Sequence, residues 1–115
     1  MKLPTMTVAT AVLLFATQGH AQSVKMKEEK PGLLQRAKIT PAAATTSART
    51  KIPKGKVVSA EIEEENGKLL YSFDIKTVGK TGIDEVNVDA MTGEILSVQH
   101  ETPKDEAREK AADRK

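Results

Sequence analysis

Four stretches in the second half of the chain alternate between apolar and polar residues. A period of two places successive side chains on opposite faces, as in a half-buried β-strand. The stretches, with the residues of their apolar faces, are 56–65 (Val58, Ala60, Ile62), 68–78 (Leu69, Tyr71, Phe73, Ile75), 83–89 (Val86, Val88) and 94–100 (Leu96, Val98).

The segments between these stretches carry residues that favour tight turns. Asn66 and Gly67 both tolerate a positive φ, so the pair predicts a two-residue hairpin loop between the first two strands. Asp89 can accept backbone N–H groups and Gly93 can take a positive φ, which predicts a tight loop before the last strand. Strands with such short connections pair with their neighbours in sequence. We therefore expect a four-stranded antiparallel meander with one apolar face.

An alanine-rich stretch just before the strands has the signals of a helix start. Thr40 is a good N-cap, and Pro41 suits the first helical position because its missing N–H is not needed there. The helix is expected to run to about Lys51, since Pro53 stops it. It is the only available cover for the apolar face of the sheet. The predicted fold class is α+β, with one alanine-rich helix packed on a four-stranded antiparallel sheet.

The start of the chain has the three parts of a secretory signal peptide, which we place at residues 1–21. Lys2 gives the positive end, residues 8–16 give a short apolar run, and a small-x-small pattern ends at Ala21. The alternative is a membrane anchor. A spanning helix needs about 20 apolar residues, and this run is roughly half as long.

The remaining segments have weaker patterns. Residues 22–32 are polar and charged, have little to bury and are expected to be mobile. The domain itself is placed at residues 33–100. It opens with the Leu33-Leu34 pair, which predicts either a short helical turn packed on the domain or a tethered apolar loop. Residues 101–115 lack a large apolar side chain, so we expect a charged tail that is partly helical or disordered.

Composition narrows the classes of function. The 115 residues hold 18 Lys and Arg against 16 Asp and Glu, and loss of Lys2 with the signal peptide would leave 17 against 16. This balance argues against a nucleic-acid binder and against strong attraction to anionic lipid. Because there is no Cys, disulfides, thiolate metal ligands and attachment as a lipoprotein are excluded. Tyr71 and Phe73, the aromatics left after residue 21, are expected to lie in the core.

The order of these parts resembles the PepSY domain family over residues 40–98. The resemblance rests on six parts in order. They are the helix start at residues 40–42, the segment 53–58, the acidic strand at 60–63, the Asn-Gly pair at 66–67, the Tyr-x-Phe strand at 71–75, and the stretch 86–96 with its closing Val-Asp-Ala-Met-Thr-Gly. It implies a helix packed on an antiparallel sheet. It also implies a module found in propeptides of thermolysin-type metalloproteases and as stand-alone exported proteins, with a proposed role in inhibiting or regulating peptidases. It implies no shared catalytic residue, and we expect no cofactor.

Residues able to do nucleophilic chemistry are sparse. His100 is the only His after residue 21, and Ser59, Ser72 and Ser97 lie in strands without an elbow motif. A nucleophile needs an oriented base beside it, so we expect His100 to be solvated rather than catalytic.

Two acidic groups have ordinary structural explanations. Glu61 and Glu63 share a strand face and could hold a cation weakly, but alternation alone explains their spacing, and an acidic face discourages edge aggregation. Asn87, Asp89 and Glu94 resemble a calcium loop but lack its regular ligand spacing and central Gly, so we expect Asp89 to cap its own turn. We assign no catalytic, cofactor-binding or metal-binding residue.

These observations favour an exported, non-enzymatic PepSY-like module that is periplasmic or secreted. Its expected partner is another exported protein, with a peptidase as the candidate, because no peptidase domain follows within these 115 residues. The sheet surface or an edge strand offers a physical route, since an edge can pair with a strand of the partner. The alternative is a passive structural or adaptor protein of the cell envelope. We expect no nucleic-acid partner and no stable membrane anchor after signal cleavage.

Overall fold

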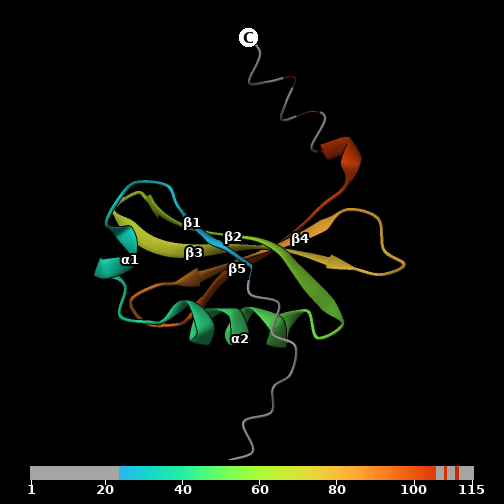
Figure 1. Ribbon diagram of the computed structural model, residues 1–115. Helices are drawn as coiled ribbons and strands as arrows, with labels where there is room; N and C mark the ends of the chain where they lie inside the picture. The colour runs from blue at the N-terminus through green and yellow to red at the C-terminus, as the bar shows by residue number, and fades with distance from the viewer. Residues whose placement is uncertain (1–23, 106–107, 109–110, 112–115) are drawn as a thin grey trace, which may run out of the picture.

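The computed structural model describes residues 24–105, 108 and 111, so the predicted signal peptide, residues 1–21, lies outside the described residues. A five-stranded sheet in the order β1-β2-β3-β4-β5 forms one layer, and α2 crosses one of its faces (Figure 1). The strands are β1 (Met26–Glu28), β2 (Gly55–Glu65), β3 (Lys68–Thr77), β4 (Ile83–Asp89) and β5 (Ile95–Glu101), and the helices are α1 (Leu33–Arg36) and α2 (Pro41–Lys51). The α+β class is confirmed. The expected four-stranded antiparallel sheet is wrong, because the sheet is mixed and has a fifth strand.

The fifth strand is β1, which pairs with β2 in parallel, Met26 opposite Ala60. The N–H of Glu29 continues this pairing by donating to the carbonyl of Ile62 at 3.0 Å. Val24 and Met26 pack against the core from this edge. The expectation that residues 22–32 have little to bury is therefore wrong, because these two apolar side chains of the segment both pack against the core.

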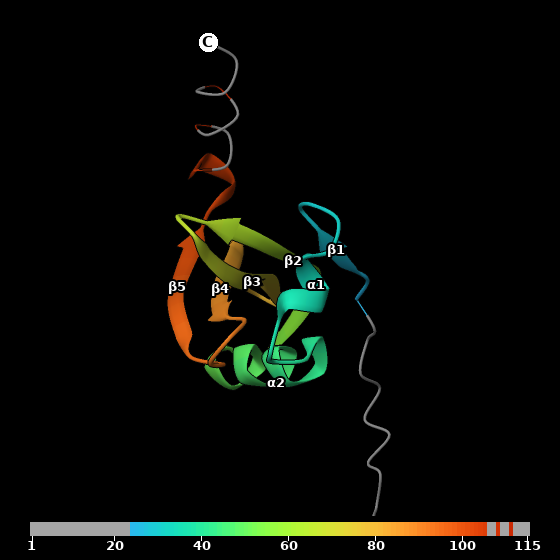
Figure 2. The same cartoon turned by 90° about the vertical axis from the view of Figure 1, so that its left-hand side faces the viewer.

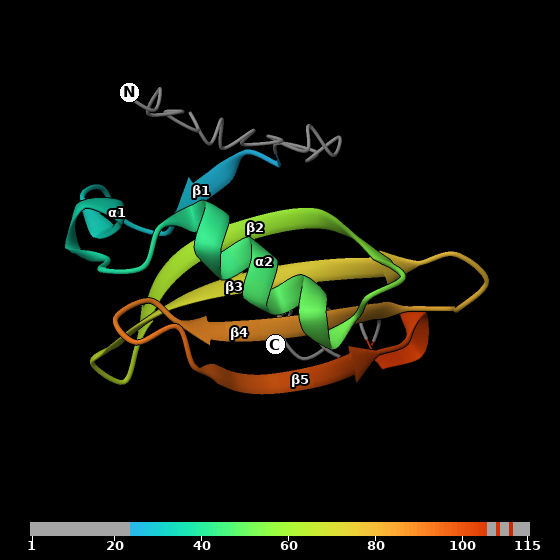
Figure 3. The ribbon, with the colours of Figure 1, turned by 90° about the horizontal axis from the view of Figure 1, so that it is seen from below.

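The second helix follows its sequence signals. The side-chain oxygen of Thr40 accepts a hydrogen bond from the N–H of Ala43 at 3.2 Å, and Pro41 is the first helical residue. Ala44 and Ala48, one turn apart, are fully buried against the sheet. Their small side chains let α2 lie close across the strands (Figure 3). The predicted helix is confirmed, and packing of this narrow alanine face holds it in place.

The turns also match the sequence. Asn66 and Gly67 have φ values of 52° and 77°, as the predicted two-residue hairpin requires, and join β2 to β3. Before β5, Gly93 has a φ of 81° and its N–H donates to the carbonyl of Asp89 at 2.8 Å. The antiparallel order β2-β3-β4-β5 follows from these short connections.

A bulge changes which residues of β2 reach the core. The pairing of β2 with β3 shifts between Val57 and Ser59. Val57 is consequently buried, and Val58 is 47% exposed. The expectation that Val58 faces the core is wrong, because the extra residue of a bulge reverses the alternation on that side of it.

The pairing of β4 with β5 shifts in a similar way between Asn87 and Val88. Ile95 packs against the core, whereas Leu96 is only partly buried and Val98 is 45% exposed. The expectation that Leu96 and Val98 share one apolar face is therefore wrong: Val98 pairs with Val86 on the covered side but is exposed at the sheet edge, whereas Leu96 falls at the irregularity. The cause is the same one-residue irregularity, which sequence periodicity alone does not reveal.

The centre of the core lies on β3. Tyr71 and Phe73 are 0% and 1% exposed, and their ring centroids lie 6.1 Å apart. The Tyr71 hydroxyl donates to the carbonyl oxygen of Ile39 at 2.6 Å, so the buried phenol has a partner. Burial raises the pKa of this Tyr. The prediction that both aromatics belong to the core is confirmed; the other large, fully buried side chains are Ile62, Ile75, Val86 and Val88.

The two faces of the sheet differ in what they carry. We call the face under α2 the covered face and the opposite one the open face; α2 lies on one side only (Figure 2). The strand register places polar side chains on the open face: Ser59, Glu61, Glu63, Ser72, Asp74, Glu85, Asn87, Ser97 and Gln99.

The chain leaves the sheet through a capped turn after β5. The N–H of Asp105 donates to the Thr102 hydroxyl at 3.3 Å, and an oxygen of the Asp105 carboxylate accepts from the N–H of Thr102 at 3.1 Å. These hydrogen bonds lower the pKa of Asp105. Over the described ranges, no helix has both the length and the apolar character to cross a membrane.

Candidate functional site

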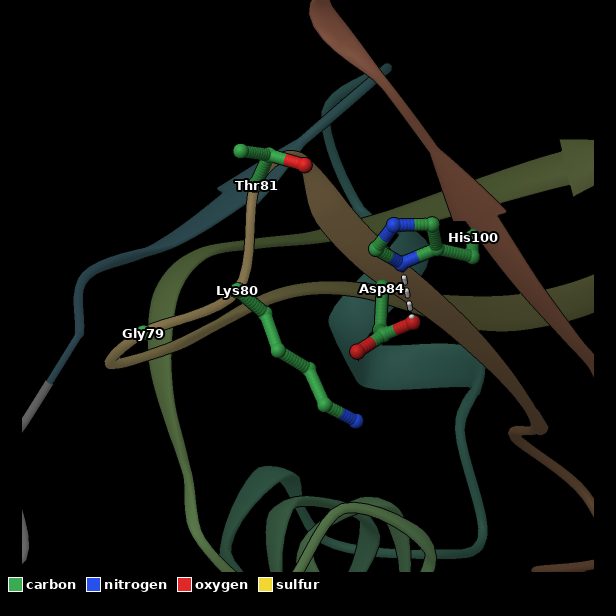
Figure 4. Close-up of a pocket in the computed structure, with 5 residues that line it drawn as sticks. All are labelled: Gly79, Lys80, Thr81, Asp84 and His100. Atoms are coloured by element: carbon green, nitrogen blue, oxygen red, sulfur yellow. Dashed lines mark hydrogen bonds and ion pairs between the residues drawn. The ribbon is translucent and has the colours of Figure 1, made fainter.

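His100 and Asp84 form a pair at one end of the covered face (Figure 4). They lie opposite each other in the β4–β5 register, and His100 Nδ1 is 2.8 Å from an oxygen of the Asp84 carboxylate. The Asp84 side chain is 13% exposed and that of His100 is 43% exposed. His100 is exposed to solvent, as expected, and the register adds a carboxylate partner that the sequence did not predict.

A cavity of about 570 Å³ borders this pair and is lined by Gly79, Lys80, Thr81, Asp84 and His100. The Lys80 side chain and the Asp84 carboxylate extend toward the same space (Figure 4). The turn that carries Lys80 is fastened by Lys76, whose ammonium donates to the carbonyls of Lys80 and Gly82 at 2.8 and 3.0 Å. Gly82 suits this turn because a Cβ there would collide with the carbonyl of Glu101. The cavity is thus held by a fixed turn.

The serines considered as nucleophiles lie on the other face of the sheet. Ser59 donates to a carboxylate oxygen of Asp74 at 2.8 Å, and Ser97 accepts from the side-chain amide of Asn87 at 3.0 Å. Both are open-face residues, whereas His100 points to the covered face. The geometry therefore separates these hydroxyls from the imidazole. The Asp84–His100 pair is better suited to binding than to activating a serine.

The acidic run of β2 divides between the two faces. Glu61 and Glu63 share the open face, as predicted, whereas Glu64 forms an ion pair with Arg36 at 2.7 Å. Burial raises the pKa of Glu63, and repulsion from neighbouring carboxylates, that of Glu61 first, raises it further. No group of three or more His, Cys, Asp or Glu within the described segments is arranged to hold a metal ion.

Asp89 caps its own turn, as predicted. One oxygen of its carboxylate accepts from the N–H groups of Met91 and Thr92 at 2.8 and 3.2 Å. The other oxygen lies 3.9 Å from the ammonium of Lys68. The carboxylate that resembled a calcium ligand is therefore already engaged in holding the loop between β4 and β5.

The two edge strands of the sheet differ in length. β5 is seven residues long and is the outermost strand on its side, so no other strand of the described chain is paired with its outer edge. On the opposite margin, β1 is three residues long and covers β2 only around residues 60–62. β5 is thus the longer edge that the sheet offers for strand addition.

Comparison with known proteins identifies the family of this chain. A family model for PepSY, described as peptidase propeptide and YPEB domain, matches residues 38–99, just over half of the chain. The chain belongs to the PepSY family. Its PepSY segment begins just before α2 and ends within β5, so β1 and α1 precede it and His100 lies one residue beyond it. The curated proteins and the solved structures give no significant match.

PepSY domains are typically non-catalytic propeptide or regulatory modules, and the match indicates no enzyme family. The contact between Asp84 and His100 was missed by sequence reasoning because it depends on the register of β4 and β5. Counting back from the predicted Asp89–Gly93 loop gives an approximate register, but the one-residue shift near Val88 makes such a count unreliable.

Proposed function

We propose that this protein is an exported, non-enzymatic PepSY module that regulates a peptidase by binding it through the outer edge of β5. Family membership supports the peptidase, because the family is described as a peptidase propeptide domain. The pattern of residues 1–21 supports export. The observation that carries the proposal is the seven-residue edge of β5, to which no strand of the described chain is paired.

The proposed contact is addition of a strand from the peptidase. Backbone N–H and C=O groups of β5 supply affinity, and the side chains on its two faces select the partner. Val98 and His100 project on the covered side, and Ser97 and Gln99 project on the open side. Val98, at 45% exposed, offers an apolar contact. A peptidase segment held along β5 is removed from substrate binding, which inhibits the enzyme.

The absence of Cys in this sequence allows a selective crosslinking test. A photoreactive group on Gln99→Cys lies beside the β5 edge, whereas the same group on Ala43→Cys lies on the exposed side of α2. We expect Gln99→Cys, and not Ala43→Cys, to crosslink a thermolysin-type metalloprotease and also a protein in the exported fraction. Equal crosslinking from both positions, or from neither, would contradict binding at β5.

Inhibition gives a second measurement. Excess full-length protein should lower the activity of the metalloprotease, and Val98→Lys should weaken this inhibition about tenfold, because a charge on an edge strand disfavours strand addition. Thr46→Lys, on the exposed surface of α2, adds the same charge away from β5 and serves as the control. Undiminished peptidase activity at saturating protein overturns the peptidase role. Export is tested separately, since the exported form should begin at Gln22.

A further inference from the structure

A cleft lies between the end of α2 and the turn that joins β3 to β4. Its volume is about 320 Å³, and we call it the lysine cleft; it is lined by Lys51, Ile52, Pro53, Lys54, Thr77 and Lys80. Ligand pockets span about 300–1,000 Å³, so this one suits a short segment of chain. Lys80 lines both the lysine cleft and the cavity beside Asp84 and His100, so the two hollows adjoin.

The three ammonium groups give the lysine cleft a positive charge. Among the residues that the structure describes, no carboxylate lies within ion-pair distance of any of them, whereas Lys68 has such a partner in Asp89. Lys51 lies in the last turn of α2, where the helix dipole favours a cation, so helix stability alone explains it. Lys54 and Lys80 lie outside the helix and are not explained in this way.

Thr77 is an independent indication of a ligand. Its hydroxyl oxygen is buried and has no hydrogen-bond partner within the described part of the chain, although the residue lines the cleft. A buried polar group without a partner is costly and uncommon in folded proteins. This oxygen is closed to the cleft in the structure, so a ligand's acceptor oxygen would give it the missing partner only if the wall shifts to expose it.

Apolar surface lies beside these polar groups. Ile52 and Pro53 form part of the cleft wall, and Val78, which follows Thr77, is 96% exposed. A ligand that carries only charge leaves this surface unused. A peptide in which an apolar side chain adjoins acidic ones matches both parts of the site.

We propose that the lysine cleft binds an acidic peptide segment of a partner protein. Carboxylates of the peptide pair with the three lysines and accept from the Thr77 hydroxyl, and an adjoining apolar side chain packs on Ile52 and Val78. Asp84, in the adjoining cavity, repels further carboxylates and so limits the acidic segment to one side of Lys80. The β5 edge takes no part, so this proposal goes beyond the strand-addition function and is tested separately.

The test uses the full chain and a fluorescein-labelled hexapeptide of alternating glutamate and leucine, with lysine in place of glutamate as the control peptide. We expect saturable binding of the acidic peptide alone. The triple variant Lys51→Gln, Lys54→Gln, Lys80→Gln should weaken it at least about tenfold, since each exposed ion pair contributes modestly. Lys27→Gln, Lys38→Gln, Lys104→Gln makes the same change in net charge at exposed sites elsewhere and should leave the affinity within about twofold.

Thr77→Val tests the hydroxyl without changing charge. It should weaken peptide binding about threefold or more while the domain remains folded, because that hydroxyl has no partner among the described residues. Circular dichroism and the Tm of every variant show whether folding is intact. Saturating acidic peptide should raise the Tm of the parent protein and not that of the cleft triple variant.

Other occupants give distinguishable results. Equal loss of binding in the two triple variants shows an effect of overall charge and overturns the cleft. Binding of inorganic phosphate or of anionic lipid vesicles, but not of the peptide, overturns the peptide as ligand. Sedimentation that shows self-association, abolished by the cleft triple variant, assigns the cleft to a second copy of this chain and overturns a separate partner.

Discussion

The covered and open faces of the sheet are built from alternate residues of the same strands, yet their side chains are held in different ways. On the covered face, Phe73 and Val86 are almost fully buried and packed under α2. On the open face, Ser59 binds Asp74 and Asn87 binds Ser97 through side-chain hydrogen bonds. Neighbouring positions therefore have different roles, because packing fixes the fold on the covered face and leaves the composition of the open face less constrained.

The largest difference should come from the neighbours Phe73 and Ser72. Phe73→Ala removes a core ring and should lower the free energy of unfolding by about 3–5 kcal/mol, whereas Ser72→Ala should change it by less than about 0.5 kcal/mol. Urea denaturation followed by circular dichroism measures both. If Phe73→Ala does not fold, Phe73→Leu serves in its place, with an expected loss of about 1–2 kcal/mol. Equal losses from Phe73 and Ser72 substitutions would erase the distinction between the faces.

Enlarging an alanine of α2 probes the contact from the helix side. Ala48→Leu inserts volume where α2 meets the sheet and should cost about 1–3 kcal/mol. Ala43→Leu, on the exposed side of the same helix, should stay within about 0.5 kcal/mol of the parent. Thermal unfolding of the two variants is the measurement. A stable Ala48→Leu variant would show that α2 does not pack tightly on the covered face.

Tyr71 tests the polar contact within the covered face. Tyr71→Phe leaves the Ile39 carbonyl without its donor and should cost about 1 kcal/mol. Burial raises the pKa of Tyr71, so the unfolded chain ionises first as the pH rises. Part of the stability should therefore be lost above about pH 10, and Tyr71→Phe should reduce that loss. Identical stability profiles for parent and variant between pH 9 and pH 11 would contradict this.

The smallest change in stability is expected on the open face, where the substitution should stabilise the protein rather than destabilise it. Burial and neighbouring carboxylates raise the pKa of Glu63, so its ionised form disfavours the folded state. The folded state takes up a proton first as the pH falls through this pKa, which stabilises it relative to neutral pH. Glu63→Gln should stabilise the protein by at most about 0.5 kcal/mol at pH 7 and have no benefit at pH 3. NMR titration of the Glu63 carboxyl carbon measures the pKa itself, and a lowered value would contradict the stated cause.

Features set by neighbouring residues were predictable from the sequence. Thr40 and Pro41 define where α2 begins, the Asn66-Gly67 pair defines the hairpin, and Asp89 closes its own loop. In each case, the residue type and its backbone conformation are linked locally. The sequence was therefore sufficient for the meander and for its covering helix.

Features set by register or by distant pairing were not predictable. A bulge at Val58 and a shift at Leu96 reverse the alternation that sequence periodicity assumes. The contact of Asp84 with His100 depends on the second of these shifts. The lysine cleft joins Lys54 to Lys80, which lie on different loops. Such sites form only when the strands pair in their final register, so they cannot be recognised from the order of residues along the chain.

The parallel pairing of β1 with β2 joins residues that are far apart in the sequence. Met26 pairs with Ala60, which is far away in the sequence, so closing this contact costs more chain entropy than closing a short loop. The hairpin of β2 and β3, by contrast, connects adjacent residues and closes early. β1 is consequently expected to pair with β2 last, after the meander has formed.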